Sequence, residues 1–276
     1  MHPVRRVAVV STGAVQIHPE HVERTRSPLP WWLLTSRRWT APRPINVYVI
    51  EHEAGLVLFD TGQDRASVTD ARYFPRGISG FLYARLARFT IGADETLTAQ
   101  LDRLGYDIAD VRVAIVSHLH QDHIGGLAEL GHAEIIVAEA EMAAARQRFA
   151  ELNGYLRRHI FLPGLRWREL DRGLDVFGDE SLTVIPTPGH TPGSLSLLVR
   201  QDGIAPLLFV GDLTYDVDLL DSGRVPGVGD EGGLAESTRK VAELSAQHPG
   251  LVVLAAHDPA AERLLAAAVS PRSVTE

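Results

Sequence analysis

Three histidines and one aspartate lie within six consecutive positions of this 276-residue chain: His118, His120, Asp122 and His123. Residues 111–116, which come shortly before them, are apolar except for Arg112, a pattern typical of a buried strand. Neutral imidazole nitrogens and carboxylate oxygens are suitable ligands for zinc and similar divalent ions. His118 and His120 can point the same way from an extended segment, and Asp122 and His123 can face a second ion after the turn. A solvated polar loop is the alternative, but the crowding of these groups favours a metal site.

The order H-x-H-x-D-H after an apolar strand resembles the ligand motif of the metallo-β-lactamase superfamily. Further parts of that family's pattern follow along the chain: His190 in Thr187-Pro-Gly-His-Thr-Pro-Gly193, Asp212 in Phe209-Val-Gly-Asp212, and His257 in Ala255-Ala-His257. The resemblance begins near Val4, extends to the C-terminal region and includes Leu58-Phe-Asp-Thr-Gly62. It implies seven metal ligands in all.

The resemblance also implies how these ligands divide between two divalent ions. One ion would be held by His118, His120 and His190, the other by Asp122, His123 and His257, with Asp212 as the bridge. Such a pair of cations lowers the pKa of a bound water toward neutrality and polarises a carbonyl, so hydrolysis needs no side-chain nucleophile. Zinc suits these ligands, and cobalt, manganese and iron suit them as well.

Asp212 limits which activities of the superfamily are expected for this chain. True β-lactamases of this fold usually lack an aspartate at this place, and many use a cysteine ligand, which a chain without cysteine cannot supply. Tyr215 follows three residues later, as in the N-acyl homoserine lactone lactonases, where a tyrosine donates its hydroxyl to the substrate carbonyl. Packing after a strand end is the alternative for Tyr215. Asp122 would pass a proton to the leaving alkoxide. For Asp60 two interpretations are open: it orients a ligand histidine, or it caps a turn.

The resemblance therefore predicts a metal-dependent hydrolase that opens a lactone ring, with N-acyl homoserine lactones as the expected substrates and quorum quenching as the role. A 4-pyridoxolactonase-like lactonase, a glyoxalase II-like thioesterase and an organophosphate hydrolase are alternatives with the same metal centre. The segment after His257 is too short for the helical domain of glyoxalase II, which disfavours the thioesterase. A nuclease like RNase Z is disfavoured by the acidic charge balance, and a scaffold without turnover by the complete ligand set.

Composition limits the partners. The chain has 27 basic and 35 acidic residues, a formal net charge of −8, which argues against nucleic acid as a partner. The absence of cysteine excludes disulfides and thiolate ligands. The apolar run at residues 7–10 is too short for a signal peptide or a membrane span. We expect a cytoplasmic protein that acts on a small molecule without a membrane partner.

The remaining histidines have no ligand-like spacing, and we expect them at the surface: His2, His18, His21, His52, His132, His159 and His248. Residues 18–44, 63–94 and 153–168 contain prolines or aromatic residues without clear periodicity and are predicted to be irregular. Their aromatic rings line an acyl pocket, belong to the core or form the surface of a homodimer; the sequence leaves these three interpretations open.

Periodicity and turn signals predict the elements that position these residues. Strands are predicted at residues 4–17 (one or two, broken near Thr12 and Gly13), 45–50, 56–59, 111–116, 133–137, 182–185, 194–199, 206–210 and 251–255. Helices are predicted at 95–104, 124–130, 138–151, 231–247 and 260–269. Two groups of strands, each followed by helices, suit two packed sheets covered by helices. The resemblance implies the same α+β class, an αββα sandwich of two mixed β-sheets, and residues 1–276 are predicted to form a single hydrolase domain.

Overall fold

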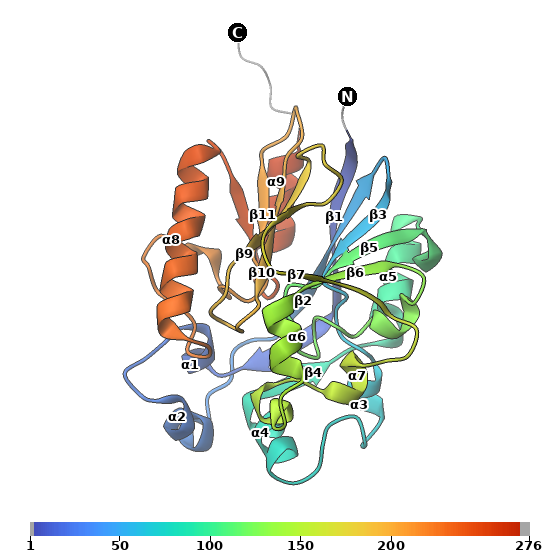
Figure 1. The fold of residues 1–276 in the computed structure, drawn as a ribbon. Coiled ribbons are helices and arrows are strands. Elements are labelled where there is room, and N and C mark those ends of the chain that lie inside the picture. Colours follow the sequence, from blue (N-terminus) through green and yellow to red (C-terminus); the bar gives the residue numbers. More distant parts are fainter. Residues whose placement is uncertain (1–2, 271–276) are drawn as a thin grey trace.

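Two mixed β-sheets lie face to face in the computed structural model, which describes residues 3–270 (Figure 1). The first sheet contains β1 (Val4–Ile17), β2 (Arg43–His52), β3 (Gly55–Phe59), β4 (Ala87–Thr90), β5 (Val111–Ile115), β6 (Glu134–Ala138) and β7 (Arg166–Leu170), in the order β4-β1-β2-β3-β5-β6-β7. The second contains β8 (Leu174–Asp175), β9 (Leu182–Pro186), β10 (Leu195–Val199), β11 (Leu207–Phe209) and β12 (Val252–Leu254), in the order β12-β11-β10-β9-β8. β3, β5, β6 and β7 run parallel, as do β11 and β12, and the other neighbours are antiparallel.

The main core lies between the two sheets. Phe59 and Ile115 project into it from the first sheet, and Leu197 and Phe209 project from the second, all fully buried. Because successive side chains on a strand point to opposite faces, Leu58 belongs instead to a cluster on the outer face of the first sheet. Strands that are buried on both faces read as continuous apolar runs, as β3 does, and β5 is apolar apart from the exposed Arg112.

Helices cover the outer faces of the sandwich. α5 (Leu97–Leu104) and α6 (Glu139–Ala145) pack on the first sheet, and α8 (Glu231–Gln247) packs on the second. α9 (Ala261–Val269) contributes apolar side chains to the core between the sheets. The predicted αββα sandwich is therefore confirmed. None of the helices within residues 3–270 has the length and hydrophobicity needed to span a bilayer.

Local sequence signals set the limits of the main helices. The Thr96 hydroxyl accepts a hydrogen bond from the Ala99 amide at the start of α5, and Gly105, with φ of 88°, ends this helix in the left-handed conformation. Asp230 caps α8 through the Gly233 amide at 2.7 Å. These caps explain why the two helices form where the sequence predicts them.

The stretches predicted to be irregular contain short helices, so that prediction was wrong in part. The short helices are α1 (Pro19–Val22), α2 (Leu29–Thr35), α3 (Ala66–Thr69), α4 (Ile78–Leu86) and α7 (Arg157–Ile160). Pro19 and Pro30 stand in the first turns of α1 and α2, where an N–H has no helical partner and its loss costs nothing. Residues 18–44, 63–90 and 146–161 are called the cap below; their helices lie together at the lower end of Figure 1.

Other predicted elements also differ from the structure. The helix predicted at 124–130 was wrong, because only a short 3-10 helix, Leu127–Glu129, forms there. β1 is one strand, although its pairing with β2 shifts between Ser11 and Ala14, where the sequence predicted a break. α6 ends at Ala145 instead of near residue 151, because the chain from 146 to 149 is exposed and offers the helix no buried face.

Candidate metal centre

One edge of the sandwich carries all seven predicted ligands on the loops that follow strands. The four residues of the H-x-H-x-D-H motif follow β5, His190 lies between β9 and β10, Asp212 follows β11, and His257 follows β12. Ligand atoms of His118, His120 and His190 lie within 4.8 Å of one another, as do those of Asp122, His123 and His257, and those of His118, His123 and Asp212. The structure therefore brings together the two sets that the family resemblance implies. The roles of the individual ligands remain predictions.

Asp212 lies between the two sets. Its Oδ1 is 3.4 Å from Nε2 of His123 and 3.3 Å from Nε2 of His257. Its Oδ2 is 3.5 Å from Nε2 of His190. A single buried carboxylate thus offers one oxygen toward each side, as a bridging ligand must.

Several atoms at this centre lack a hydrogen-bond partner, and this fits divalent cations. Nε2 of His118, Nε2 of His123 and Oδ1 of Asp212 are buried and unpaired within the described residues. A buried polar atom without a partner is costly, so such atoms are rare unless they serve another purpose. Burial, together with the neighbouring imidazoles, holds the pKa of His118 well below its ordinary value, so its ring is neutral, the form that binds metal.

Hydrogen bonds on the far side of two rings fix which of their nitrogens faces the centre. His257 Nδ1 donates to the Pro44 carbonyl at 2.9 Å, and His120 Nε2 donates to the Asn153 carbonyl at 3.1 Å. Because a carbonyl can only accept, these nitrogens carry the protons, and the opposite nitrogens present lone pairs to the centre. Gly154, next to Asn153, has φ of +93°, and a Cβ there would lie 2.4 Å from His120.

Asp60 orients a ligand histidine, which was one of the two interpretations that the sequence left open. Its Oδ2 lies 2.8 Å from Nδ1 of His123, so Nε2 of that ring points into the centre. The same carboxylate accepts hydrogen bonds from the Ser117 amide at 2.7 Å and the Ser117 hydroxyl at 2.9 Å. Asp60 has φ of 63°, a strained conformation for a residue other than glycine, and such strain is common at functional sites.

Glu141 connects two ligand loops, and the sequence analysis missed it. The side chain, at the start of α6, is fully buried. It accepts hydrogen bonds from the amide of Leu119 at 2.9 Å and from the amide of Gly193 at 3.0 Å. It therefore holds the loop of His118 against the loop of His190. The available signal was a glutamate on the otherwise apolar buried face of a predicted helix.

Tyr215 lies beside Asp212, as its spacing predicts. Its side chain is buried, and its hydroxyl donates to Oδ2 of Asp212 at 2.8 Å and lies 3.0 Å from Nε2 of His21. Burial, and then the Asp212 carboxylate, hold the pKa of Tyr215 well above its ordinary value, so the phenol keeps its proton. A protonated phenol at this place is a hydrogen-bond donor beside the ligand cluster.

Three histidines that were expected at the surface are buried, so that expectation was wrong for His18, His21 and His52. His18 contacts backbone carbonyl oxygens within the cap, and His52 lies 3.2 Å from Asp179. His21 faces Tyr215, and burial lowers its pKa to about 3, so the ring is neutral. Tertiary contacts of this kind leave no signal in the spacing of histidines. His132 is exposed, His159 and His248 are partly exposed, and His2 lies outside the described residues.

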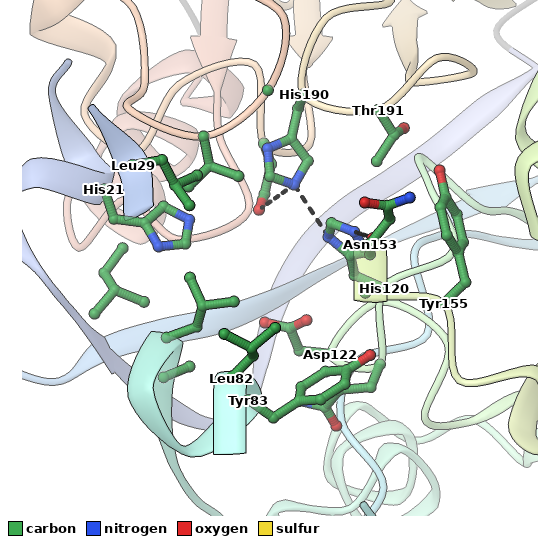
Figure 2. A pocket seen from close by; sticks show the side chains of 18 of the residues that line it. His21, Leu29, Leu82, Tyr83, His120, Asp122, Asn153, Tyr155, His190 and Thr191 are labelled. Carbon is green, nitrogen blue, oxygen red and sulfur yellow. Dashed lines mark hydrogen bonds and ion pairs between the residues drawn. The ribbon is translucent and has the colours of Figure 1, made fainter. Parts of the chain in front are cut away.

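An elongated apolar cavity of about 650 Å³ extends from the ligand cluster into the cap. Its walls include Asp122, Asp212 and Tyr215 at one end and leucines of α2 and α4 at the other. Figure 2 shows His21, Leu29 and Leu82 on one side of the cavity, opposite His120, Asn153 and Tyr155 on the other. The cavity thus has polar side chains, including predicted metal ligands, at one end and largely apolar side chains elsewhere. This is the composition expected for a small-molecule site.

The fold and the site together define the class of this protein. The fold is an αββα sandwich, and histidine and aspartate side chains cluster at one of its edges. The chain belongs to the metallo-beta-lactamase superfamily, whose family model matches residues 40–257. His21 lies outside the matched residues.

Curated relatives and solved structures are similar to this chain over most of its length. The N-acyl homoserine lactonase AttM of Agrobacterium fabrum is 35% identical over 78% of this chain and 82% of its own. An N-acyl homoserine lactonase of a Bacillus species is 30% identical over 80% and 83%. An N-acyl homoserine lactone hydrolase with N-hexanoyl-L-homoserine at its catalytic metal centre shares the fold with a TM-score of 0.78 and 24% identity, covering 94% of this chain and 96% of its own. AidC, a dizinc quorum-quenching lactonase, gives 0.64 and 18%, covering 94% and 90%.

Proposed function

We propose that this protein is a quorum-quenching N-acyl homoserine lactonase, which opens the lactone ring with the help of two divalent ions, and that the ions are zinc. The observation that carries the proposal is the position of Tyr215, a protonated phenol between the bridging Asp212 and the cavity. The relatives named N-acyl homoserine lactonases, at 30 and 35% identity, support it.

The seven ligands divide as the resemblance implies, with Asp212 shared between the two sets. Two divalent ions held there supply a water of lowered pKa and polarise the carbonyl that it attacks. The protein's contribution is to hold the ligand rings with one nitrogen toward the centre, through partners such as Asp60 and the Pro44 carbonyl. Zinc suits a centre built from imidazole and carboxylate alone.

Tyr215 and Asp122 act on the two substrate oxygens that gain negative charge, the carbonyl oxygen and the leaving alkoxide. The Tyr215 hydroxyl donates a hydrogen bond to the carbonyl oxygen as negative charge develops on it, which stabilises the transition state more than the substrate. Asp122 lies at the cavity wall, 3.5 Å from Nε2 of His257, and its carboxylate takes up the proton that the attacking water releases and passes it to the alkoxide that leaves when the ring opens.

The cavity accommodates an acyl chain. A homoserine lactone ring at the ligand cluster places its amide-linked chain toward the leucines of α2 and α4. Each methylene group that is buried there contributes about 0.8 kcal/mol of binding free energy. This apolar wall favours an acylated lactone over a small polar lactone.

Purified protein, analysed for metals and then assayed on a substrate panel, tests the proposal. We expect close to two zinc ions per chain, loss of activity with a strong chelator, and the highest kcat/KM on acyl homoserine lactones. The panel also contains 4-pyridoxolactone, a glutathione thioester and a phosphotriester. Higher kcat/KM on any of those three than on every acyl homoserine lactone would contradict the substrate, and full activity without metal would contradict the centre.

A further inference from the structure

The exposed apolar side chains of this protein gather in the cap. Within residues 3–270, the large hydrophobic side chains that stand exposed are Trp31, Leu34, Val68, Ile78, Phe81, Phe149, Leu152 and Phe161. All of them belong to the three cap segments, which are far apart in the sequence. Ile78 is 75% exposed and Trp31 is 65% exposed. Concentration of such side chains at one end of a protein marks an interaction surface, whereas scattered ones need no explanation.

The cavity opens within this surface. Leu34 and Leu152 line the cavity and are also 59% and 47% exposed, so they stand at its rim. Leu34 comes from α2 and Leu152 from the chain after α6, and α4 contacts both of these segments. A molecule that covers the cap therefore also covers the entrance to the site.

The charge of the cap is opposite to that of the rest of the chain. The cap contains 14 arginines and five acidic residues, whereas the remainder contains 13 basic and 30 acidic residues. The five acidic residues of the cap are partly exposed, and its exposed ionic residues are all arginines. Those that form no ion pair with a described residue are Arg26, Arg37, Arg38, Arg65, Arg76, Arg88, Arg148, Arg157 and Arg158.

We propose that the cap is a docking surface for lipid bilayers with anionic headgroups, on which the protein adsorbs without crossing the membrane. Exposed aromatic and aliphatic side chains enter the boundary between headgroups and acyl chains, and the surrounding arginines attract the anionic headgroups. The expectation of no membrane partner rested on spanning and targeting segments alone. This surface is assembled from three segments, so none of them shows it in isolation.

Two other partners, a second copy of this chain and single-stranded nucleic acid, fit the cap less well than an anionic bilayer does. A symmetric dimer through the cap would set the arginines of one copy against those of the other, because a two-fold interface pairs a patch with itself. Single-stranded nucleic acid fits arginine and aromatic rings, but aliphatic side chains such as Ile78 and Val68 offer no base-stacking surface. Both alternatives are outcomes of the test below.

Docking also places the cavity next to substrate that is dissolved in the membrane. This consequence rests on the proposed function. An acyl chain that partitions into a bilayer can move from the membrane to the apolar wall at Leu34 and Leu152 without crossing water. Adsorption itself requires no substrate, so it can be measured whether or not the protein is a lactonase.

Co-sedimentation of the full-length, metal-loaded protein with vesicles tests the docking. We expect binding to vesicles of phosphatidylcholine and phosphatidylglycerol, little binding to phosphatidylcholine alone, and weaker binding as salt increases. Trp31 emission should shift to shorter wavelength on binding, and Trp31→Phe should remove most of that shift. Arg37→Glu with Arg38→Glu should weaken binding at least about tenfold, because each basic residue near the surface contributes appreciably.

The matched control is Arg239→Glu with Arg263→Glu, which changes the net charge equally on exposed positions of α8 and α9. It should bind the anionic vesicles nearly as wild type does. All four positions lie outside the cavity wall, so hydrolysis of a short-chain lactone in solution serves as the check of folding. Absence of vesicle binding at low salt, or equal losses in both double variants, would overturn the proposal. So would a cap-dependent dimer, or tighter binding to a single-stranded oligonucleotide than to the vesicles.

Discussion

The loops that carry the metal ligands and the cap that covers them are built in different ways. Several rings of the ligand cluster are held by one defined atom, such as Oδ2 of Asp60 for His123 or the Pro44 carbonyl for His257. The cap consists of helices of four to nine residues with exposed apolar side chains and unpaired arginines. From this difference we expect the reaction to depend on fixed atoms, and substrate access and choice to depend on the shape and composition of a surface.

This comparison predicts the largest effect at the bridge. Asp212→Ala removes the carboxylate shared by both ligand sets, so we expect loss of metal and a decrease in kcat/KM on the order of a thousandfold or more. Elemental analysis and steady-state kinetics measure both effects. His159→Ala, a change in the cap at a partly exposed residue, should alter turnover little. An Asp212 variant that keeps both ions and near-normal turnover would show that the bridge is wrongly assigned.

Tyr215 lies where the two regions meet and should give the next largest effect. Tyr215→Phe removes one donor to the developing oxyanion and keeps the packing of the ring. The expected loss is about 1 to 3 kcal/mol of transition-state stabilisation, roughly tenfold to a few hundredfold in kcat/KM on acyl homoserine lactones. Metal content should not change. Equal, small losses on a lactone and on a phosphotriester would mean that Tyr215 only packs.

Asp60 tests whether the support of a ligand ring is as important as the ring itself. Asp60→Asn retains a residue that tolerates positive φ and removes the negative charge beside His123. We expect metal affinity to fall by about tenfold to a hundredfold. Competition with a fluorescent zinc chelator measures this affinity, and Glu180→Gln, at the other non-glycine position with positive φ, is the control. Unchanged affinity would restrict Asp60 to a backbone role.

The cap should give the smallest effect, and one that depends on the substrate. Leu82→Ala on α4 shortens the apolar wall, so KM for a long-chain acyl homoserine lactone should rise about fivefold, as expected from the loss of roughly one kcal/mol of apolar contact. The butanoyl substrate should be almost unaffected, because its chain ends before this wall. The same change in KM for both chain lengths would place the acyl chain elsewhere.

Four members of the ligand cluster were predictable because their information is local in the sequence, whereas His190, Asp212 and His257 followed from the family resemblance. The spacing of His118, His120, Asp122 and His123, and the apolar strand before them, place four ligands on one loop without any knowledge of the fold. The αββα class followed from the two groups of strands and from the family resemblance, and the structure confirms it.

The cap was not predictable because its structure depends on contacts between distant segments. The residues of α2 and α4 show no strong helical periodicity, and these helices pack against each other and the chain after α6. His21 and Glu141 are buried by the same kind of long-range packing. The position of Glu141 on an apolar helix face signals burial, but neither residue's sequence context identifies its contacts, with Tyr215 for His21 and with the ligand loops for Glu141.

Glu141 fixes the distance between two ligand loops with hydrogen bonds that involve no metal. In small domains whose loops are organised only by an ion, the chain without its ion is unfolded. Here Glu141 joins the two loops through the polypeptide itself, so we expect them to keep their arrangement without the ions. Zinc would then enter a chain that is already folded, and zinc removed by a chelator could be restored without refolding.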